Sequence, residues 1–295
     1  MNERSGSNLK AKLILLAGVF SCSMSSAFFR YMTAPSTIAA TYRLGWTVLL
    51  LTPLIFSKRE TRKELLSLKG KDLAFCGLSG LFLAMHFVVW FESLSNTSIA
   101  SSTVLVNTEV AFAAFGYLIF FGKKIRKKEI LAIGIAFLGS VVIAMADTGG
   151  GAGKNAVLGD ILALLAAFFS ACYTRIGTRE RSHMSTMVYT YVLYWGCFLS
   201  LLVFDAVSGV PMTGYEPINW IMSLCLAVFC TLLGHSVFSW SLKFLTPTYV
   251  STVKLAGPVF ASISAILLFG EIPGLIQVAG AAVVLAGVYL YAKNS

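Results

Sequence analysis

The chain has 295 residues, of which 57% are hydrophobic and only 12% are charged, and it carries a formal net charge of +10. Soluble globular domains contain about 25% charged residues, so this composition excludes a water-soluble fold. Hydrophobic runs of about 20 residues, the length that crosses a bilayer as a helix, recur along the chain and predict an all-α membrane protein. The runs are continuous rather than alternating, which argues against a transmembrane β-barrel.

Ten transmembrane helices are predicted, and most of them are joined by short connections. The predicted spans are 11–32, 36–56, 72–92, 99–121, 128–146, 157–177, 184–205, 217–240, 246–269 and 274–293. The first span follows a basic flank without a clear cleavage sequence, so we expect a retained helix rather than a signal peptide. A glycine-rich loop at 147–156 separates domains 1–146 and 157–295, which have five predicted helices each.

The basic residues are distributed unequally between the two sides of the predicted bundle. If the N-terminus is cytoplasmic, 19 of the 23 Lys and Arg residues fall in cytoplasmic segments and 2 fall in outer segments. This positive-inside pattern predicts a multi-pass protein of the cell membrane with both termini in the cytoplasm. Because the loops would face anionic lipid, the net positive charge does not indicate nucleic-acid binding.

Cysteine and motif content exclude several other classes. The six cysteines lie in hydrophobic runs without CxxC spacing, which predicts packed thiols rather than disulfides or metal ligands. The sequence has no P-loop and no constellation of a nucleophile with a base, so we expect neither an ATP-driven pump nor an enzyme. We expect no cofactor, and a monomer or a homodimer.

The two halves of the chain are related by a repeat. Residues 93–144 align without gaps on residues 241–292, with Gly139 opposite Gly287, and SSAFFR upstream pairs with SACYTR. Since each half has an odd number of helices, the halves must lie in opposite orientations. Inverted repeats in a membrane bundle indicate a secondary transporter that works by alternating access, with its substrate near the midplane.

A group of helix-breaking and turn residues marks the second half. Pro258 lies within a helix, Gly270 and Glu271 form a turn, and Gly280 and Gly287 are spaced along the last helix. This pattern resembles the EamA domain of the drug/metabolite transporter superfamily, and the resemblance covers nearly the whole chain as two domains. It implies ten helices and metabolite transport, usually export, without indicating the substrate.

The first half departs from this pattern at two positions. Val110 stands where the second half has Pro258, and Lys123 stands where it has Glu271. The first difference leaves open whether the fourth helix bends as the ninth helix is expected to bend.

An ionisable residue within a predicted span costs about 2.5–3.5 kcal/mol on insertion scales and marks a candidate functional position, and three such residues stand out. They are Glu109, Lys254 and Arg43. At about 1.5 Å per residue, Glu109 lies about 15 Å from the outer boundary and Lys254 about 12 Å from the inner boundary. Both are expected near the midplane, on helices that the resemblance places face to face across a pathway.

Two interpretations of Glu109 and Lys254 remain open. Either they form an ion pair that only joins the two halves, or they line the pathway. In the second case they would bind a zwitterion such as an amino acid, with its ammonium group at Glu109 and its carboxylate at Lys254 or Arg43. A variant has Glu109 carrying a proton, because burial favours the protonated form of a carboxyl group.

The other candidates each have a structural alternative. Arg43 suits a structural role as well as a substrate contact. His86 and Trp90 share one face of the third span, where Trp90 equally suits an interfacial anchor. Asn107 precedes the carboxylate of the fourth span by two residues and belongs to the same candidate site. His235, near the inner end of the eighth span, is expected to pack rather than to bind.

Gly257 and Pro258 predict a hinge in the ninth helix, because both residues weaken a helix. Arg30 and Arg175 occupy equivalent positions of the repeat on opposite sides, where they suit a rim, a gate or ordinary interfacial anchoring.

The sequence therefore predicts a secondary transporter that exports a small molecule, first an amino acid or a similar zwitterion. Proton-coupled export of a drug, an amine or a nucleobase is the alternative. A channel and a membrane-bound receptor are the competing classes.

Overall fold

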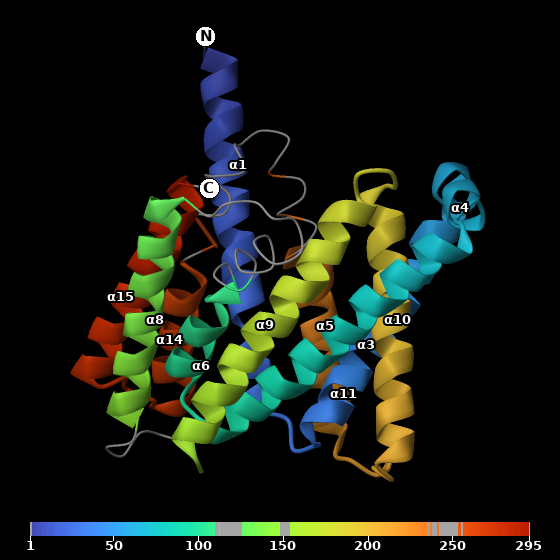
Figure 1. The fold of residues 1–295 in the computed structure, drawn as a ribbon. Helices are drawn as coiled ribbons and strands as arrows, with labels where there is room; N and C mark the ends of the chain where they lie inside the picture. The colour runs from blue at the N-terminus through green and yellow to red at the C-terminus, as the bar shows by residue number, and fades with distance from the viewer. Residues whose placement is uncertain are drawn as a thin grey trace.

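The computed structural model describes residues 2–109, 112, 126–147, 154–234, 237, 241, 253–254 and 256–294. Every regular element in these ranges is a helix, and the helices form a bundle (Figure 1). Six segments are long and apolar enough to cross a membrane: Lys10–Arg30, Ser36–Ser57, Gly70–Asn96, Ala156–Glu180, Thr186–Val207 and Pro217–Gly234. The chain is thus a multi-pass all-α membrane protein, as its composition predicts.

The elements follow the predicted spans. They are α1 (Asn2–Ser23), α2 (Ser25–Arg30), α3 (Ser36–Ser57), α4 (Arg59–Leu66), α5 (Gly70–Asn96), α6 (Ile99–Val106), α8 (Lys127–Asp147), α9 (Ala156–Glu180), α10 (Thr186–Val207), α11 (Pro217–Cys225), the π-helix η1 (Leu226–Gly234), α14 (Gly257–Phe269) and α15 (Leu275–Asn294). The first predicted span comprises α1 and α2, and the eighth comprises α11 and η1. Parts of the fourth and ninth spans, together with His235, lie outside the described residues.

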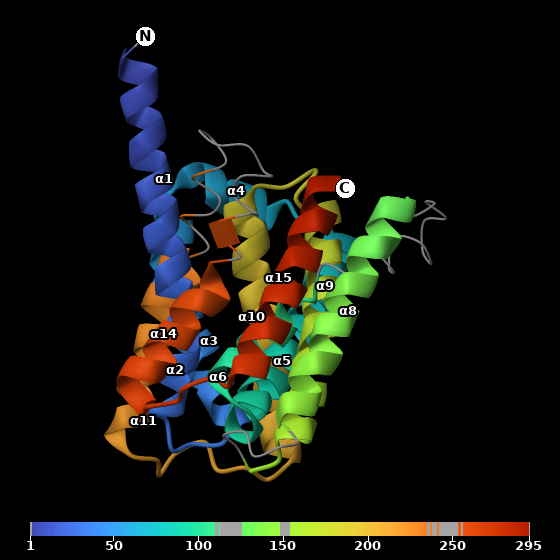
Figure 2. The same ribbon diagram turned by 90° about the vertical axis from the view of Figure 1, so that its left-hand side faces the viewer.

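Helix α4 is an element that the sequence analysis did not predict. Its sequence, RETRKELL, contains no buried residue. Hydropathy identifies helices that bury an apolar stripe or cross lipid, so a charged surface helix gives no signal. α4 lies at the end of the bundle that also carries both chain termini (Figures 1 and 2).

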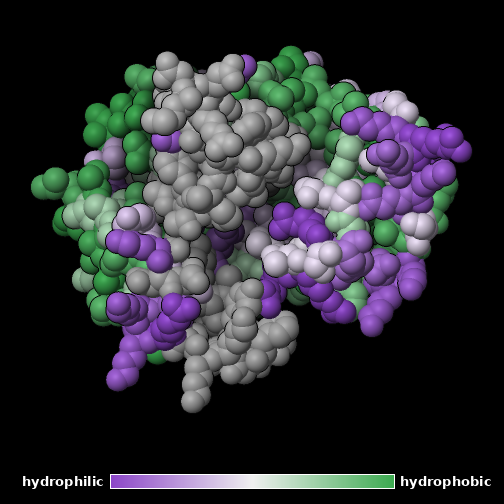
Figure 3. All heavy atoms as spheres, turned by 90° about the horizontal axis from the view of Figure 1, so that it is seen from above, coloured by the Kyte–Doolittle hydropathy of each residue, from purple (hydrophilic) through white to green (hydrophobic). Residues whose placement is uncertain are grey.

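Large apolar side chains are exposed along the sides of the bundle. Leu131, Phe137 and Leu138 on α8 and Leu267 on α14 are examples. Such surface is unfavourable in water but compatible with lipid tails, which are equally apolar. Seen from the end that carries the termini, hydrophobic residues extend along the rim, whereas hydrophilic residues gather on the side of α4 (Figure 3).

Helices α8 and α15 pack directly against each other (Figure 2). A Cβ added at Gly139 would lie 2.6 Å from Val284 N, and one added at Gly287 would lie 2.5 Å from Ala136 N. No side chain fits at these separations, so the glycines allow the two backbones to approach closely. Gly139 and Gly287 are equivalent in the repeat, so corresponding helices of the two halves meet through corresponding residues.

The fourth predicted helix is interrupted. Helix α6 ends at Val106, and the next two residues form a turn. Asn107 Nδ2 donates to Thr103 O at 2.6 Å, while Asn107 N donates to Val104 O at 3.1 Å. In a continuous α-helix, Asn107 N would donate to Thr103 O. Because the Asn107 side chain bonds to that carbonyl, Asn107 N bonds to Val104 O instead, and the last turn of α6 tightens.

The ninth helix is interrupted at the equivalent position. Helix α14 begins at Gly257, after a turn at Ala256, and the repeat offset relates Ala256 to Thr108 in the turn after α6. Pro258 lies in the first turn of α14, where its missing N–H costs no helical hydrogen bond. The fourth helix therefore breaks as the ninth does, although Val110 replaces the proline.

Candidate functional site

A cavity of about 410 Å³ lies where the two interrupted helices meet α1, α3, α5, α9, α10 and η1. Small-molecule sites usually occupy clefts of about 300–1,000 Å³, so the volume suits a ligand the size of an amino acid. The lining includes every residue that the sequence analysis proposed for substrate contact or for a hinge: Arg43, His86, Trp90, Asn107, Glu109, Lys254, Gly257 and Pro258.

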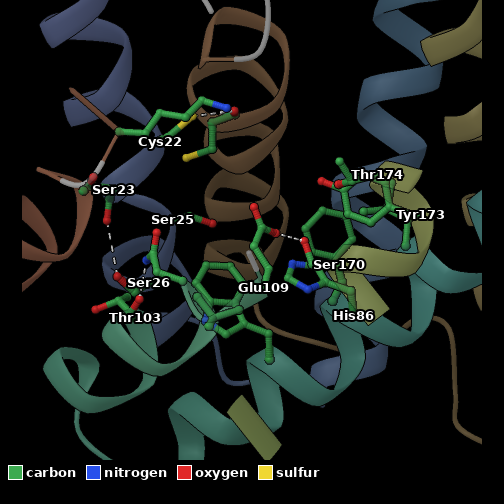
Figure 4. Close-up of a pocket in the computed structure, with 18 of the residues that line it drawn as sticks. Cys22, Ser23, Ser25, Ser26, His86, Thr103, Glu109, Ser170, Tyr173 and Thr174 are labelled. Carbon is green, nitrogen blue, oxygen red and sulfur yellow. Dashed lines mark hydrogen bonds between the residues drawn. The ribbon is translucent and has the colours of Figure 1, made fainter. Parts of the chain in front are cut away.

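Glu109 directly follows the turn after α6 and is half-buried. Ser170 Oγ on α9 donates a hydrogen bond to Glu109 Oε2 (Figure 4). The interrupted helix of the first half is therefore linked to the second half through a hydroxyl group. A hydroxyl orients a carboxylate without neutralising it, so the negative charge remains effective in the cavity.

Lys254 precedes the turn at Ala256 and lines the same cavity, with an exposed side chain. Glu109 and Lys254 therefore belong to the lining of one cavity.

Arg43 on α3 is only 3% exposed. Its Nε donates to Thr231 Oγ1 at 2.9 Å, its Nη1 donates to Ser25 Oγ at 3.2 Å, and its Cζ lies 4.3 Å from the centroid of the Phe87 ring. Within the described ranges, no carboxylate approaches the guanidinium to 4.0 Å. A buried cation is costly without an anion, so this position favours a negatively charged ligand group.

The π-helix η1 positions the acceptor of Arg43. Thr231 Oγ1 donates to Leu226 O, five residues earlier, at 3.2 Å and accepts the hydrogen bond from Arg43 Nε. π-Helical turns are rare and occur frequently at functional sites, where the wider turn displaces a side chain. The sequence analysis missed Thr231, because a threonine in an apolar run does not reveal a π-turn.

His86 and Trp90 form an aromatic wall of the cavity. His86 Nδ1 lies 2.9 Å from Ala166 O. A carbonyl oxygen only accepts, so Nδ1 carries the proton and Nε2 of a neutral ring is left as an acceptor. The His86 ring stacks on Trp90, with centroids 6.0 Å apart and an interplanar angle of 16°. Trp90 therefore packs within the bundle, against the core and beside the cavity.

Several polar lining residues were not proposed from the sequence. Ser23, Ser25, Ser26, Thr103, Ser170, Tyr173 and Thr174 all belong to the lining (Figure 4). Ser and Thr are frequent in membrane helices, so hydropathy does not distinguish functional hydroxyls from ordinary ones. The repeat was the sequence signal that could have identified some of them. Its paired segments SSAFFR and SACYTR contribute Ser25, Ser26, Ser170 and Tyr173 to the cavity lining.

An ion pair closes the end of the bundle opposite the termini. Arg30 Nη1, at the end of α2, lies 2.5 Å from Glu271 Oε1, which follows α14. Arg30 Nη2 also donates to Thr97 O at 2.7 Å, and Glu271 Oε2 accepts from Ile99 N at 3.0 Å. These bonds join α2, the α5–α6 turn and the end of α14, so both halves are held together at this end.

The cavity extends toward the other end of the bundle. Along α9 its lining runs from Ser170 through Tyr173 and Gly177 to Arg181, which is exposed. At about 1.5 Å per residue this stretch is about 16 Å long. The described part of the lining thus reaches the exposed end of α9.

Comparisons with known proteins agree with a transporter architecture. An uncharacterized transporter of Archaeoglobus fulgidus is 26% identical over 82% of this chain and 84% of its own. A protein of Salmonella typhimurium named as a probable amino-acid metabolite efflux pump is 27% identical over 58% of this chain and 59% of its own. A pseudopaline exporter of Pseudomonas aeruginosa is 22% identical over 90% of this chain and 93% of its own.

The fold is also found among solved protein structures. One crystal structure is similar with a TM-score of 0.61 and 15% identity, over 96% of this chain and 97% of its own. At that identity the likeness concerns the fold alone. The EamA-like transporter family matches twice, over residues 9–145 and residues 157–292. These two matches cover nearly the whole sequence, and the chain therefore belongs to the EamA-like transporter family.

Proposed function

We propose that this transporter carries a small zwitterionic metabolite, an amino acid or a similar molecule, by alternating access through the cavity. The proposal includes ten membrane helices in two inverted repeats, residues 1–146 and 157–295, joined by the loop 147–156. It places both termini on the cytoplasmic side of the cell membrane. Export is the proposed direction, and the printed names of two relatives, an efflux pump and an exporter, support it.

The observation that carries the proposal is the presence of unlike charges in one cavity. Arg43 is buried against hydroxyl and aromatic groups, and Glu109 is held by the hydroxyl of Ser170. A zwitterion supplies an anion for the guanidinium and a cation for the carboxylate, so each end of the ligand meets the opposite charge. Lys254 adds a second cation at the exposed part of the lining.

The two interrupted helices favour transport over static binding. Their turns, at Thr108 and Ala256, fall at equivalent positions of the repeat and lie next in sequence to Asn107 and Gly257 of the cavity lining. In secondary transporters, interrupted helices form the substrate site near the midplane, and one repeat moves against the other around that site.

The contacts between helices follow the repeat. Helix α1 packs against α14 as α9 packs against α6, and α3 packs against η1 as α10 packs against α5. Two halves that make equivalent contacts are able to exchange conformations. Such an exchange would open the end now held by Arg30 and Glu271 and close the end at which Arg181 lies.

Proton-coupled export of another small organic solute, such as a drug, an amine or a nucleobase, is the alternative. Glu109 is a carboxylate of the cavity lining and is the group that would take part in proton coupling. Under this alternative the carboxylate carries the coupling ion rather than the ammonium group of the substrate.

Counterflow into liposomes that contain the purified protein tests the proposal. The panel contains amino acids, amines that lack a carboxylate and carboxylic acids that lack an ammonium group. We expect both truncated classes to compete about tenfold or more weakly than amino acids, because a lost hydrogen bond to a charged group costs about 1.5–3 kcal/mol. Equal competition by amines, or flux that does not saturate as in a channel, would contradict the proposal.

Two variants separate the contributions of the charges. Glu109→Gln should lose the discrimination against carboxylic acids, and Arg43→Met should lose the discrimination against amines. Glu60→Gln and Arg59→Met, on the exposed helix α4, are matched controls and should transport as the unaltered protein does. Unchanged transport and pH dependence in Glu109→Gln would contradict a role for Glu109. Activity restored by adding Lys254→Met would indicate a purely structural pair.

A further inference from the structure

A second cluster of titratable side chains lies outside the cavity, at the end of the bundle near α4. Asp72 comes from the first turn of α5, Glu180 from the end of α9 and His183 from the α9–α10 turn. One carboxylate oxygen or ring nitrogen of each residue lies within 4.8 Å of the others. The three residues meet because α5 packs along α9.

The separations within this cluster suit metal coordination better than hydrogen bonding. His183 Nε2 lies 3.4 Å from Asp72 Oδ1 and 3.4 Å from Glu180 Oε2. An N–H···O hydrogen bond spans about 2.7–3.2 Å. Two ligands that lie about 2.0–2.1 Å from one tetrahedral zinc ion are about 3.3–3.4 Å apart. The ring nitrogen therefore stands at a ligand–ligand distance from both carboxylates.

Each carboxylate has one oxygen engaged elsewhere and the other directed at His183. Asp72 Oδ2 accepts from Lys69 N at 3.1 Å, which leaves Oδ1 as the oxygen nearest the imidazole. Glu180 Oε1 faces Arg179 Nε at 3.7 Å, whereas Oε2 faces His183. Outer partners that orient ligating groups in this way are typical of metal sites.

Glu180 gives an independent indication of a ligand. Its side chain is 1% exposed, and within the described residues Oε2 is buried and accepts no hydrogen bond. A buried carboxylate oxygen without a donor is costly, and a cation beside it removes that cost. The His183 side chain is 47% exposed, so an ion has access from solvent.

We propose that Asp72, Glu180 and His183 bind a divalent transition-metal ion such as Zn²⁺, with water completing the coordination. One imidazole nitrogen with two carboxylate oxygens suits zinc, whereas Mg²⁺ and Ca²⁺ prefer oxygen ligands alone. The ion would join α5 of the first half to the α9–α10 turn of the second half, close in sequence to Arg181 of the cavity lining. The inference does not depend on the identity of the transported substrate.

Zinc binding to the full chain, purified in detergent without a histidine tag, tests this proposal. Calorimetry should show one Zn²⁺ per chain, and the bound ion should raise the unfolding temperature. X-ray absorption should show nitrogen or oxygen ligands at about 2.0–2.1 Å and no sulfur at about 2.3 Å. His183→Ala, Asp72→Asn and Glu180→Gln should each weaken the binding at least tenfold.

The variants differ in their structural risk. Glu180 is buried and its variant risks misfolding, whereas His183→Ala changes a half-exposed turn residue and keeps the test decisive. Glu60→Gln on α4 is the matched control and should bind zinc as the unaltered protein does. Absence of zinc binding, sulfur ligands, or unchanged affinity in His183→Ala would overturn the proposal. An equal rise of the unfolding temperature with Mg²⁺ would overturn the assignment to a transition metal.

Discussion

Two charged side chains of the cavity, Glu109 and Arg43, are held by uncharged neighbours. Ser170 orients Glu109, while Ser25, Thr231 and Phe87 surround Arg43. Hydroxyl groups and aromatic rings stabilise a charge locally and leave its net value unchanged. A ligand of opposite charge therefore gains the full electrostatic interaction, which an internal ion pair would have reduced.

Ser170→Ala removes the donor to Glu109 and should raise the substrate concentration for half-maximal counterflow about tenfold. The reason is that a hydrogen bond to a charged group contributes about 1.5–3 kcal/mol. Ser200→Ala on α10 is the control, since Ser200 Oγ donates within its own helix to Gly196 O and lies outside the cavity lining. If the substrate concentration for half-maximal counterflow is unchanged in Ser170→Ala, the hydroxyl group does not orient the carboxylate during transport.

At the scale of elements, glycines determine how closely helices approach. Gly139 and Gly287 bring α8 and α15 together, while Gly134 on α8 has no atom within 4 Å of an added Cβ. A glycine on one face of α8 therefore permits close packing against α15, whereas a glycine on another face has open space beside it.

Gly139→Ala should lower the unfolding temperature in detergent, because its Cβ would lie 2.6 Å from Val284 N and backbone atoms must shift. Overpacking of this kind costs about 1–3 kcal/mol. Gly134→Ala is the matched control and should leave stability unchanged or raise it by up to about 1 kcal/mol, since alanine favours a helix over glycine. If both variants unfold at the same temperature, close α8–α15 packing does not contribute to stability.

The interrupted helices show which local features a sequence reveals. Pro258 predicted an irregularity in the ninth helix, and the structure places it at the first turn of α14. The break after Val106 depends instead on a hydrogen bond from the side chain of Asn107 to Thr103 O. Asparagine occurs in continuous helices as well, so this break could not be read from the residue type.

At the scale of the whole molecule, the two ends of the bundle differ. Arg30 and Glu271 hold one end together, and the cavity reaches toward the other end, where Arg181 is exposed. Under the proposed alternating access, the ion pair must break when the transporter opens at the end opposite the termini.

Glu271→Gln should therefore shift the population toward the state that is open at the end opposite the termini. Spin labels at Ser95 and Ile272, two exposed positions near the ion pair, on a cysteine-free background would report the shift as a longer distance component. Glu92→Gln is the control, because Glu92 lies near the same end and accepts from Ser36 Oγ without joining the ion pair. An identical distance distribution in Glu271→Gln would exclude the ion pair as a gate.

Sequence reasoning predicted the all-helical membrane class from the long apolar runs. It identified the EamA-like relationship, which the family match confirms, from Pro258, the Gly270–Glu271 turn and the spaced glycines of the last helix. It proposed Glu109, Lys254 and Arg43 because a charge in an apolar run is conspicuous. The sequence did not show which residues that are distant along the chain lie close together in the fold. Asp72 is distant in sequence from Glu180 and His183, and no motif spacing connects them. Their meeting results from the packing of α5 on α9.

The Arg30–Glu271 ion pair has an electrostatic consequence for the proposed transport cycle. In the sequence repeat, Arg30 corresponds to Arg175 and Glu271 corresponds to Lys123, so the attracting pair is matched by two positively charged residues. Dissolved salt weakens attraction and repulsion alike. In the proposed cycle, rising ionic strength should therefore destabilise closure at the end held by Arg30 and Glu271 and favour closure at the opposite end. A structurally symmetric cycle would thus respond asymmetrically to its ionic surroundings.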